Sequence, residues 1–313
     1  MQKNLAVTSS PHLRDSMSTQ RIMQEVCLAL APAGIAGIIL FGMNAAVLIA
    51  ASVITCVVAE YVWQKLNHQT VTVADWSAVV TGLLLAYNLP ATAPVWIAVV
   101  GSIIAIVLVK QCFGGIGGNF MNPALTARAV LFVSWSGIMA SYPQTRFAAD
   151  AVSSATPLAT LGGGTVGNLS FWNLLIGNCG GVIGETCKIA LILGGAYLIW
   201  RGLIDWRIPL AFIGTAFICF LLKDGLQVAV YEMFAGSLLL GAFFMATDYV
   251  TSPVTHLGRV IMGVGCGLIL FIIRAFASYP EGCSFAILFM NVATPLIDRF
   301  TTLKPFGEVK KHG

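Results

Sequence analysis

The residues best suited to chemistry lie in a polar stretch, DAVSSATP, at positions 150–157. Ser153, Ser154 and Thr156 carry hydroxyl groups, which can form an ester with an incoming group. The same residue types also form turns and helix N-caps, and Thr156 directly precedes Pro157. Taken alone, the stretch is therefore read most simply as a polar turn or an N-cap.

Charged and polar residues inside apolar segments are the second set of candidates. Arg128 lies well inside the apolar segment 122–140, and a charge within a membrane span is costly and marks function. Asn122 and Asp248 lie at predicted helix breaks, so we expect them to flank whatever the core binds. Glu185 and Lys188 are three residues apart. On one helical face they would neutralise each other, and a functional role is the alternative.

The composition of the chain indicates which kind of structure positions these residues. The 313 residues are 58% hydrophobic and only 10% charged, and the mean hydropathy is +0.86. Soluble domains carry about 25% charged residues, so this chain cannot cover a soluble surface. The sequence predicts an all-α membrane protein that crosses the bilayer many times.

Ten apolar segments are each long enough, or nearly so, to cross the bilayer as a helix. The segment 77–89 is short and ends in Asn-Leu-Pro, which predicts a broken helix, and the Gly-rich piece 171–184 is predicted to be re-entrant or interfacial. The ten predicted segments are 22–41, 44–63, 77–89, 93–110, 122–140, 184–200, 207–222, 229–246, 258–275 and 283–300.

The distribution of Lys and Arg predicts the orientation. With the N-terminus inside, the outer side collects only Arg146, Lys223 and Arg274, and two cations fall within spans. This bias favours cytoplasmic termini and an external 141–170 loop. The topology also accounts for the net charge of +4, so the charge gives no sign of a nucleic-acid partner. The cations predicted inside are Lys3, Arg14, Arg21, Lys65, Lys110, Arg201, Arg207, Arg259, Arg299, Lys304, Lys310 and Lys311.

Two segments align without a gap, GLLLAYNLPATAPV (82–95) and GAFFMATDYVTSPV (241–254). Each contains a Thr/Pro break inside a helix. Five spans is an odd number, so the second copy of a five-span repeat must be inverted, an arrangement with which many carriers build a midplane site. Chance similarity between Gly/Ala-rich helices is the alternative.

Neither the cysteines nor the glycines predict a further site. The eight Cys contain no C-x-x-C pair and are typical of small apolar residues in spans, so no metal is predicted. The Gly-rich stretch 114–131 lacks the Gly-Lys-Ser/Thr ending of a phosphate loop. Close helix packing is the better interpretation of these glycines.

The full pattern Asp150-x-x-Ser153-Ser154-Ala155-Thr156 resembles the D-x-x-[ST]-G-A-[ST] signature. At that signature a flavin transferase attaches FMN to a Thr or Ser hydroxyl through a phosphoester. Ser154 replaces the usual Gly. The resemblance implies that Thr156 carries covalent FMN.

The resemblance extends over residues 20 to 300. GNFMNPALTARA (118–129), GETCKIALILGGAYLI (184–199), GAFFMATDYVTSPV (241–254) and YPEGCSFAILFMNVATPLID (279–298) are similar to the family of the Rnf D subunit and the B subunit of the sodium-pumping NADH:quinone reductase. The short N-terminal region favours the Rnf branch.

The resemblance implies an electron carrier in the bacterial cell membrane, within a ferredoxin:NAD oxidoreductase that moves Na⁺ or H⁺. It implies the A, B, C, E and G subunits as partners, a flavin transferase, contact with membrane lipid, and in some members a second, non-covalent riboflavin. It also implies a fold related to urea and ammonium channels, which suits the inverted repeat. No NAD, ferredoxin or iron–sulfur motif is found in the sequence.

We therefore expect five regions along the chain. They are a cytoplasmic tail (1–21), a first five-helix repeat (22–140), an external loop with the flavin site and the re-entrant segment (141–183), a second five-helix repeat (184–300) and a cytoplasmic tail (301–313). Two other functions stay open at this point. One is the quinone-reductase homologue, and the other is a passive channel or carrier for a small solute, which would need no flavin.

Overall fold

Long apolar helices dominate the structure, a computed structural model that describes residues 17–147, 157–162, 164, 166, 170–277 and 281–302. Five helices within these ranges are long and apolar enough to cross a membrane. This confirms the prediction of a helical protein with many membrane spans. The five helices are α1 (Thr19–Phe41), α2 (Met43–Leu66), α10 (Arg207–Phe234), α12 (His256–Phe276) and α13 (Cys283–Thr301).

Shorter helices lie between these spans. The predicted short segment 77–89 is α3, which ends before the Asn-Leu-Pro break as expected. The piece 171–184 contains only the six-residue α8 (Phe171–Ile176), which is too short to cross the membrane. The other apolar helices are α3 (Ser77–Tyr87), α4 (Val95–Ile103) with the π-helix η2 (Ile104–Gln111), α5 (Pro123–Ser134) with α6 (Ser136–Met139), α9 (Lys188–Trp200), and α11 (Leu238–Leu240) with the π-helix η3 (Gly241–Met245). Two further short pieces are the 3₁₀-helix η1 (Val73–Asp75) and α7 (Pro157–Leu161).

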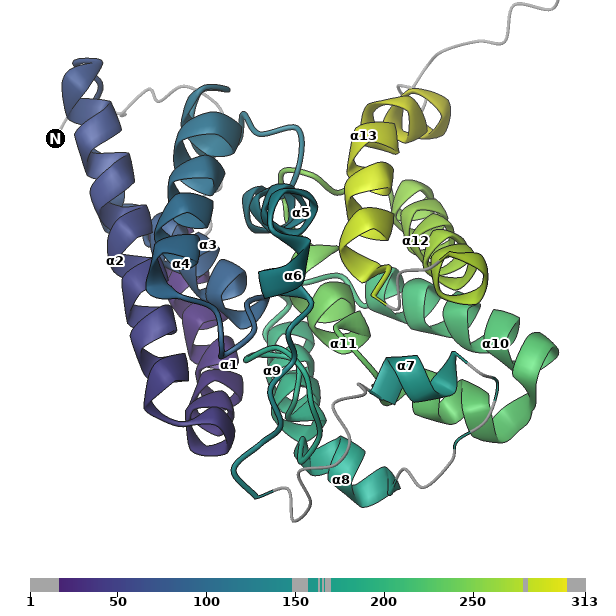
Figure 1. Cartoon of the computed structure of the whole chain (residues 1–313). Helices are drawn as coiled ribbons and strands as arrows, with labels where there is room; N and C mark the ends of the chain where they lie inside the picture. Colours follow the sequence, from purple (N-terminus) through teal and green to yellow (C-terminus); the bar gives the residue numbers. More distant parts are fainter. Residues whose placement is uncertain are drawn as a thin grey trace, which may run out of the picture.

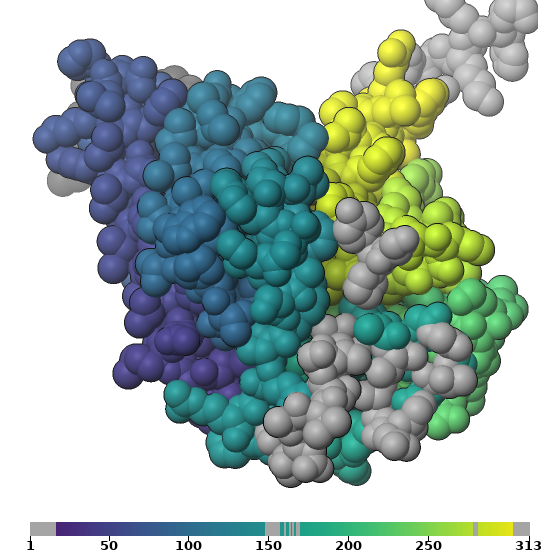
Figure 2. Space-filling view, viewed as in Figure 1, coloured from purple at the N-terminus to yellow at the C-terminus, as the bar shows by residue number. Residues whose placement is uncertain are grey.

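The two halves of the chain lie side by side. In Figure 1 the purple-to-blue helices α1 to α4 form one side, and the green-to-yellow helices α10, α12 and α13 form the other. Helices α5 and α6 lie between the two sides, and α7 and α8 lie together at one end of the molecule. Figure 2 shows the same division on the surface, with teal atoms between blue and yellow. Helix α5 contacts α13, which joins the halves.

The prediction of one span over 229–246 is wrong. Helix α10 continues to Phe234 across a kink at Gly225, whose φ is 84°. The chain turns at Gly236, with φ 64°, and only then begins α11. Hydropathy is insensitive to such breaks, whereas glycine adopts a positive φ without the steric penalty of other residues. The segment 122–140 is likewise divided into α5 and α6 at Trp135.

Small residues bring the helices close enough to position the interior. A Cβ atom added to Gly263 or Gly267 of α12 would lie 2.8 Å from the carbonyl oxygens of Ile208 and Phe212 of α10 respectively. Likewise, a Cβ atom on Gly82 of α3 would lie 2.7 Å from the Cα atom of Val53 of α2. Such close backbone approach is typical of membrane helix pairs.

Candidate functional site

The predicted modification stretch, Asp150 with Ser153, Ser154, Ala155 and Thr156, lies outside the described residues. The described chain resumes at Pro157, the first residue of α7. Leu158 and Leu161 of α7 are buried against Val228 and Ala235, which lie in and just after α10. The residue bonded to Thr156 is therefore held on the second half of the molecule.

A small cavity of about 20 Å³ lies beside Pro157. Three of its lining residues carry a formal charge: Glu185, Lys188 and Glu281. Tyr142 and Cys179 also line it. Their partial burial raises the pKa of Tyr142 to about 12 and that of Cys179 to about 11. Both therefore keep their protons at neutral pH. The cavity lies between the α7 region and the charged interior.

The two residues of the predicted Glu185–Lys188 pair do not share a helix. Helix α9 begins at Lys188, and Glu185 lies in the turn before it. Lys188 Nζ donates to the backbone carbonyl of Glu185 and, at 2.7 Å, to that of Gly236. Because the helix starts too late, the spacing of three residues does not create a side-chain ion pair. The prediction that the two side chains share one helical face was wrong.

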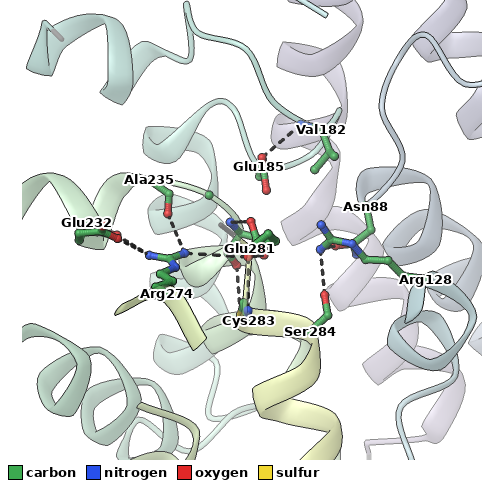
Figure 3. A network of polar contacts seen from close by, with 12 residues as sticks. Asn88, Arg128, Val182, Glu185, Glu232, Ala235, Arg274, Glu281, Cys283 and Ser284 are labelled. Atoms are coloured by element: carbon green, nitrogen blue, oxygen red, sulfur yellow. Dashed lines mark hydrogen bonds and ion pairs between the residues drawn. The ribbon is translucent and has the colours of Figure 1, made fainter. Parts of the chain in front are cut away.

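Arg128 is buried, as its position inside an apolar segment predicted. It lies on α5 and is only 4% exposed. Its Nη1 donates to Asn88 Oδ1 at 2.7 Å and to Ser284 Oγ at 2.9 Å (Figure 3). Asn88 ends α3 in the first half, and Ser284 lies in α13 of the second half. The guanidinium group therefore links the two halves.

A second buried arginine, Arg274, ties together three segments of the second half. Its Nη1 donates to Glu232 Oε2 at 2.9 Å, and its Nη2 donates to the carbonyl of Ala235 at 3.2 Å (Figure 3). Nη2 also lies 3.9 Å from Glu281 Oε1. Glu281 accepts hydrogen bonds from the backbone N–H and the hydroxyl of Ser237. This network holds the start of α13 against the turn between α10 and α11.

Asn122 occupies the predicted helix break and caps α5. Its Oδ1 accepts from the N–H groups of Ala124 and Leu125, at 3.1 and 3.2 Å. Its Nδ2 donates to the carbonyl of Met245 at 3.4 Å. Met245 ends the π-helix η3, and its sulfur also lies 3.7 Å from Asn88 Nδ2. Through Asn88 and Met245 the structure connects Asn122 to Arg128.

Asp248 lines a larger cavity of about 490 Å³. The walls are mainly apolar, and they include residues of α1, α3, α9 and η3. Polar groups of Ser77, Thr81, Lys110, Asn122 and Thr247 also face it. Asp248 Oδ2 accepts a hydrogen bond from Thr251 Oγ1 at 3.2 Å. Asn122 and Asp248 thus line one cavity, whereas Arg128 is not among its lining residues.

Sequence reasoning missed the buried ion pairs. Lys110 and Arg274 counted as loop charges in the topology, but they are only 3% and 8% exposed. Lys110 Nζ lies 2.9 Å from both carboxylate oxygens of Glu60, and Gln111 also donates to Glu60. The pairs Glu60–Lys110 and Glu232–Arg274 join positions 50 and 42 residues apart. A local pattern cannot reveal such pairs, although a lone Glu inside an apolar run was a usable signal.

Fold and site together define a class of protein: a helical membrane protein with many spans, broken helices and a charged interior shared between its halves. The chain belongs to the NQR2, RnfD, RnfE family, whose model matches residues 6–307.

Named relatives agree with this family. The chain is 53% identical to the D subunit of the Na⁺-translocating ferredoxin:NAD⁺ oxidoreductase complex of Acetobacterium woodii, over 98% of this chain and 96% of the relative. It is 41% identical to the proton-translocating counterpart of Clostridium ljungdahlii, over 98% of each. It is 33% identical to the D subunit of the ion-translocating oxidoreductase complex of Escherichia coli, over 97% of this chain and 99% of the relative.

Proposed function

We propose that this chain is the D subunit of an ion-translocating ferredoxin:NAD⁺ oxidoreductase in the bacterial cell membrane. The observation that carries this proposal is 53% identity over almost the full length of both chains to a subunit of that name. Three relatives named as D subunits match nearly end to end, which favours this function over the quinone-reductase homologue and over a passive channel. The coupling ion is Na⁺ or H⁺, because relatives are named for each.

Thr156 carries FMN through a phosphoester in this proposal, and Asp150, Ser153, Ser154 and Ala155 form the sequence that the flavin transferase recognises. Pro157, which follows Thr156, lines a cavity together with Lys188 and the carboxyl groups of Glu185 and Glu281. The Arg274 guanidinium lies 3.9 Å from Glu281, so the position next to Thr156 borders a charged region. FMN supplies electron-transfer chemistry when bound, and the protein contributes position and electrostatics.

The 490 Å³ cavity beside Asp248 is our proposed place for the second, non-covalent riboflavin. Its volume falls within the range of small-molecule sites, about 300–1,000 Å³. Apolar walls such as Leu84 and Phe243 suit a flat ring system, and the side chains of Thr81 and Asn122 offer hydrogen bonds. Two flavins held in one chain would supply two electron-carrying positions.

The ten-helix arrangement is part of the proposal. Shifting the alignment by 159 residues pairs α2 with α10, α3 with α11 and η3, α4 with α12, and α5 with α13. The same shift carries α1 onto a range that ends with α9. This order supports two inverted five-helix repeats over 22–140 and 184–300, related to urea and ammonium channels.

The route of the coupling ion passes Asn122 and Asp248 in this proposal, with Arg128 at the junction of the halves. Both termini are cytoplasmic, and the 141–183 region faces outward. The partners are the A, B, C, E and G subunits of the complex and the transferase, within membrane lipid and without nucleic acid.

In-gel fluorescence of the denatured chain tests the flavin assignment, because only a covalently bound flavin survives denaturation. We expect Thr156→Ala to abolish the fluorescence and Thr156→Ser to retain part of it, since the ester needs a hydroxyl oxygen. Ser153→Ala is the comparison and should lose less of the label than Thr156→Ala, because Ser153 does not form the ester bond. An unmodified mass for the peptide 147–160, in protein made together with the transferase, would remove FMN from Thr156.

A further inference from the structure

Glu185 combines deep burial with an unused acceptor atom. The residue is 6% exposed, and its Oε1 accepts a hydrogen bond from the N–H of Val182 at 3.2 Å (Figure 3). Its Oε2 has no hydrogen-bond partner among the described residues. A buried carboxylate oxygen without a donor costs free energy. The atom therefore needs a proton or a water molecule.

The neighbouring charged groups are already committed to other partners. Lys188 of α9 donates to the carbonyls of Glu185 and Gly236. Arg128 of α5 donates to Asn88 and Ser284. Arg274 of α12 is paired with Glu232 of α10. No salt bridge to the Glu185 carboxylate is present within the described part of the chain, although Lys188 and Arg128 act on it electrostatically.

Glu281 differs from Glu185 in its hydrogen bonds. Its two oxygens accept from the N–H and the hydroxyl of Ser237, and Arg274 lies beside it. These donors and this cation stabilise the ionised form of Glu281. The charge on Glu281 also acts on Glu185. Among the described residues, the Glu185 carboxyl group accepts one hydrogen bond, from the N–H of Val182, and has no cation paired with it. Of two neighbouring carboxyl groups, the one with fewer donors and no paired cation takes up a proton first.

The cavity beside Glu185 suits a proton rather than a metal ion. Its volume of about 20 Å³ holds roughly one water molecule. The Lys188 ammonium group lines the same space and would repel a second cation. Among the residues that the structure describes, no group of three or more His, Cys, Asp or Glu side chains could hold a metal ion. Tyr142 and Cys179 keep their protons at neutral pH, and Ser237 and Arg274 hold Glu281 in its ionised form. Glu185 is therefore the carboxyl group of this wall that is able to exchange a proton.

We propose that Glu185 is a proton-binding site, which exchanges a proton at Oε2 through the cavity lined by Pro157, Tyr142 and Cys179. Pro157 is bonded to the proposed flavin carrier Thr156, so the link of this proton to electron transfer rests on the proposed function. A change of charge near Thr156 is offset when Glu185 binds or releases its proton. The proton-binding itself needs no flavin.

Infrared difference spectroscopy of the full chain across a pH step tests the site. The C=O stretching band of a protonated carboxyl group is separate from the bands of a carboxylate. We expect one buried carboxyl band that Glu185→Gln removes and Glu185→Asp shifts. Glu25→Gln is the matched control. Glu25 lies in α1 of the first half and pairs with Arg201, away from the cavity beside Glu185. This variant should therefore leave the band in place.

The Thr156→Ala variant separates this inference from the flavin assignment, because it should keep the infrared band while losing fluorescence. In the complete complex, proton uptake on chemical reduction, followed with a pH-sensitive dye, should fall by about one proton per chain in Glu185→Gln. Identical spectra for wild type and Glu185→Gln would overturn the proposal. A band that responds to Na⁺ at fixed pH would replace the proton with a metal cation.

Discussion

At the scale of single residues, part of the polar interior could be predicted from polar side chains in or beside apolar segments, because burying such groups costs free energy. Arg128 was singled out because a charge inside a span is costly, and it is buried with two hydrogen-bond partners. Asn122 and Asp248 were chosen at helix breaks, and both line the 490 Å³ cavity. Glu281 could not be found in this way, because its partner Ser237 is 44 residues away along the chain.

Asp248 is the residue whose charge we expect to matter for ion coupling. Asp248→Asn keeps an oxygen that can accept the hydrogen bond from Thr251, and it removes the negative charge from the cavity wall. We predict that ion uptake into proteoliposomes falls severalfold more than ferredoxin:NAD⁺ electron transfer.

Asp224→Asn is the control for this variant, because Asp224 forms a pair with Lys223 away from the cavity lining. If Asp248→Asn pumps ions with the same yield per electron as the wild type, Asp248 does not belong to the ion route.

At the scale of helices, the sequence indicated those whose ends coincide with a change in composition. The predicted segments 22–41, 184–200 and 283–300 correspond to α1, α9 and α13. Helix α10 was misjudged because Gly225 kinks it without interrupting the apolar run. The buried pair of α2 and η2 also escaped prediction, since Glu60 and Lys110 meet only after these two helices have packed together.

Breaking the Glu60–Lys110 pair should destabilise the first half strongly. Lys110→Met leaves the carboxylate of Glu60, 1% exposed, without its cation. A buried charge left unpaired costs roughly 3–5 kcal/mol of unfolding free energy. The double variant Glu60→Leu with Lys110→Met should recover most of this loss, because it removes both charges.

Lys223→Met provides the comparison, since Lys223 is 35% exposed in its pair with Asp224 and such a pair contributes about 0–1 kcal/mol. Unfolding in detergent, followed by circular dichroism, measures all three variants. Equal losses of unfolding free energy in Lys110→Met and Lys223→Met would mean that the buried pair contributes no more to stability than the exposed pair.

At the scale of the whole molecule, the described part of each half contains a buried ion pair between its second helix and a later helical segment. Glu60–Lys110 joins α2 to η2, and Glu232–Arg274 joins α10 to α12. In each half, the pair connects the second helix (α2 or α10) to the helical segment that follows the Thr/Pro break (η2 or α12). Two inverted repeats would place these pairs near opposite faces of the membrane, which agrees with the sides assigned to Lys110 and Arg274 from the charge distribution.

A fusion experiment tests that orientation. A reporter that is active only outside the membrane should give signal when inserted in the 141–170 loop and none when fused after Lys311. The contrast between the two positions is the readout, and expression of both fusions is checked with an antibody. Signal at both positions would require an even number of crossings between the loop and the C-terminus and would rule out a second five-helix repeat. Signal at the C-terminus alone would reverse the orientation.

The π-helix η2 limits how this chain can change in length. Lys110 reaches Glu60 from its last turn, and a π-helix holds more residues per turn than an α-helix. Deleting one residue here could be absorbed, because the wide turn can close as an ordinary α-helical turn. Inserting a further residue between Ile104 and Val109 would instead turn Lys110 away from Glu60. The turn after Cys112, where Gly114, Gly115 and Gly117 have positive φ, carries no such constraint, so we expect an inserted residue to be tolerated there and to be destabilising one turn earlier.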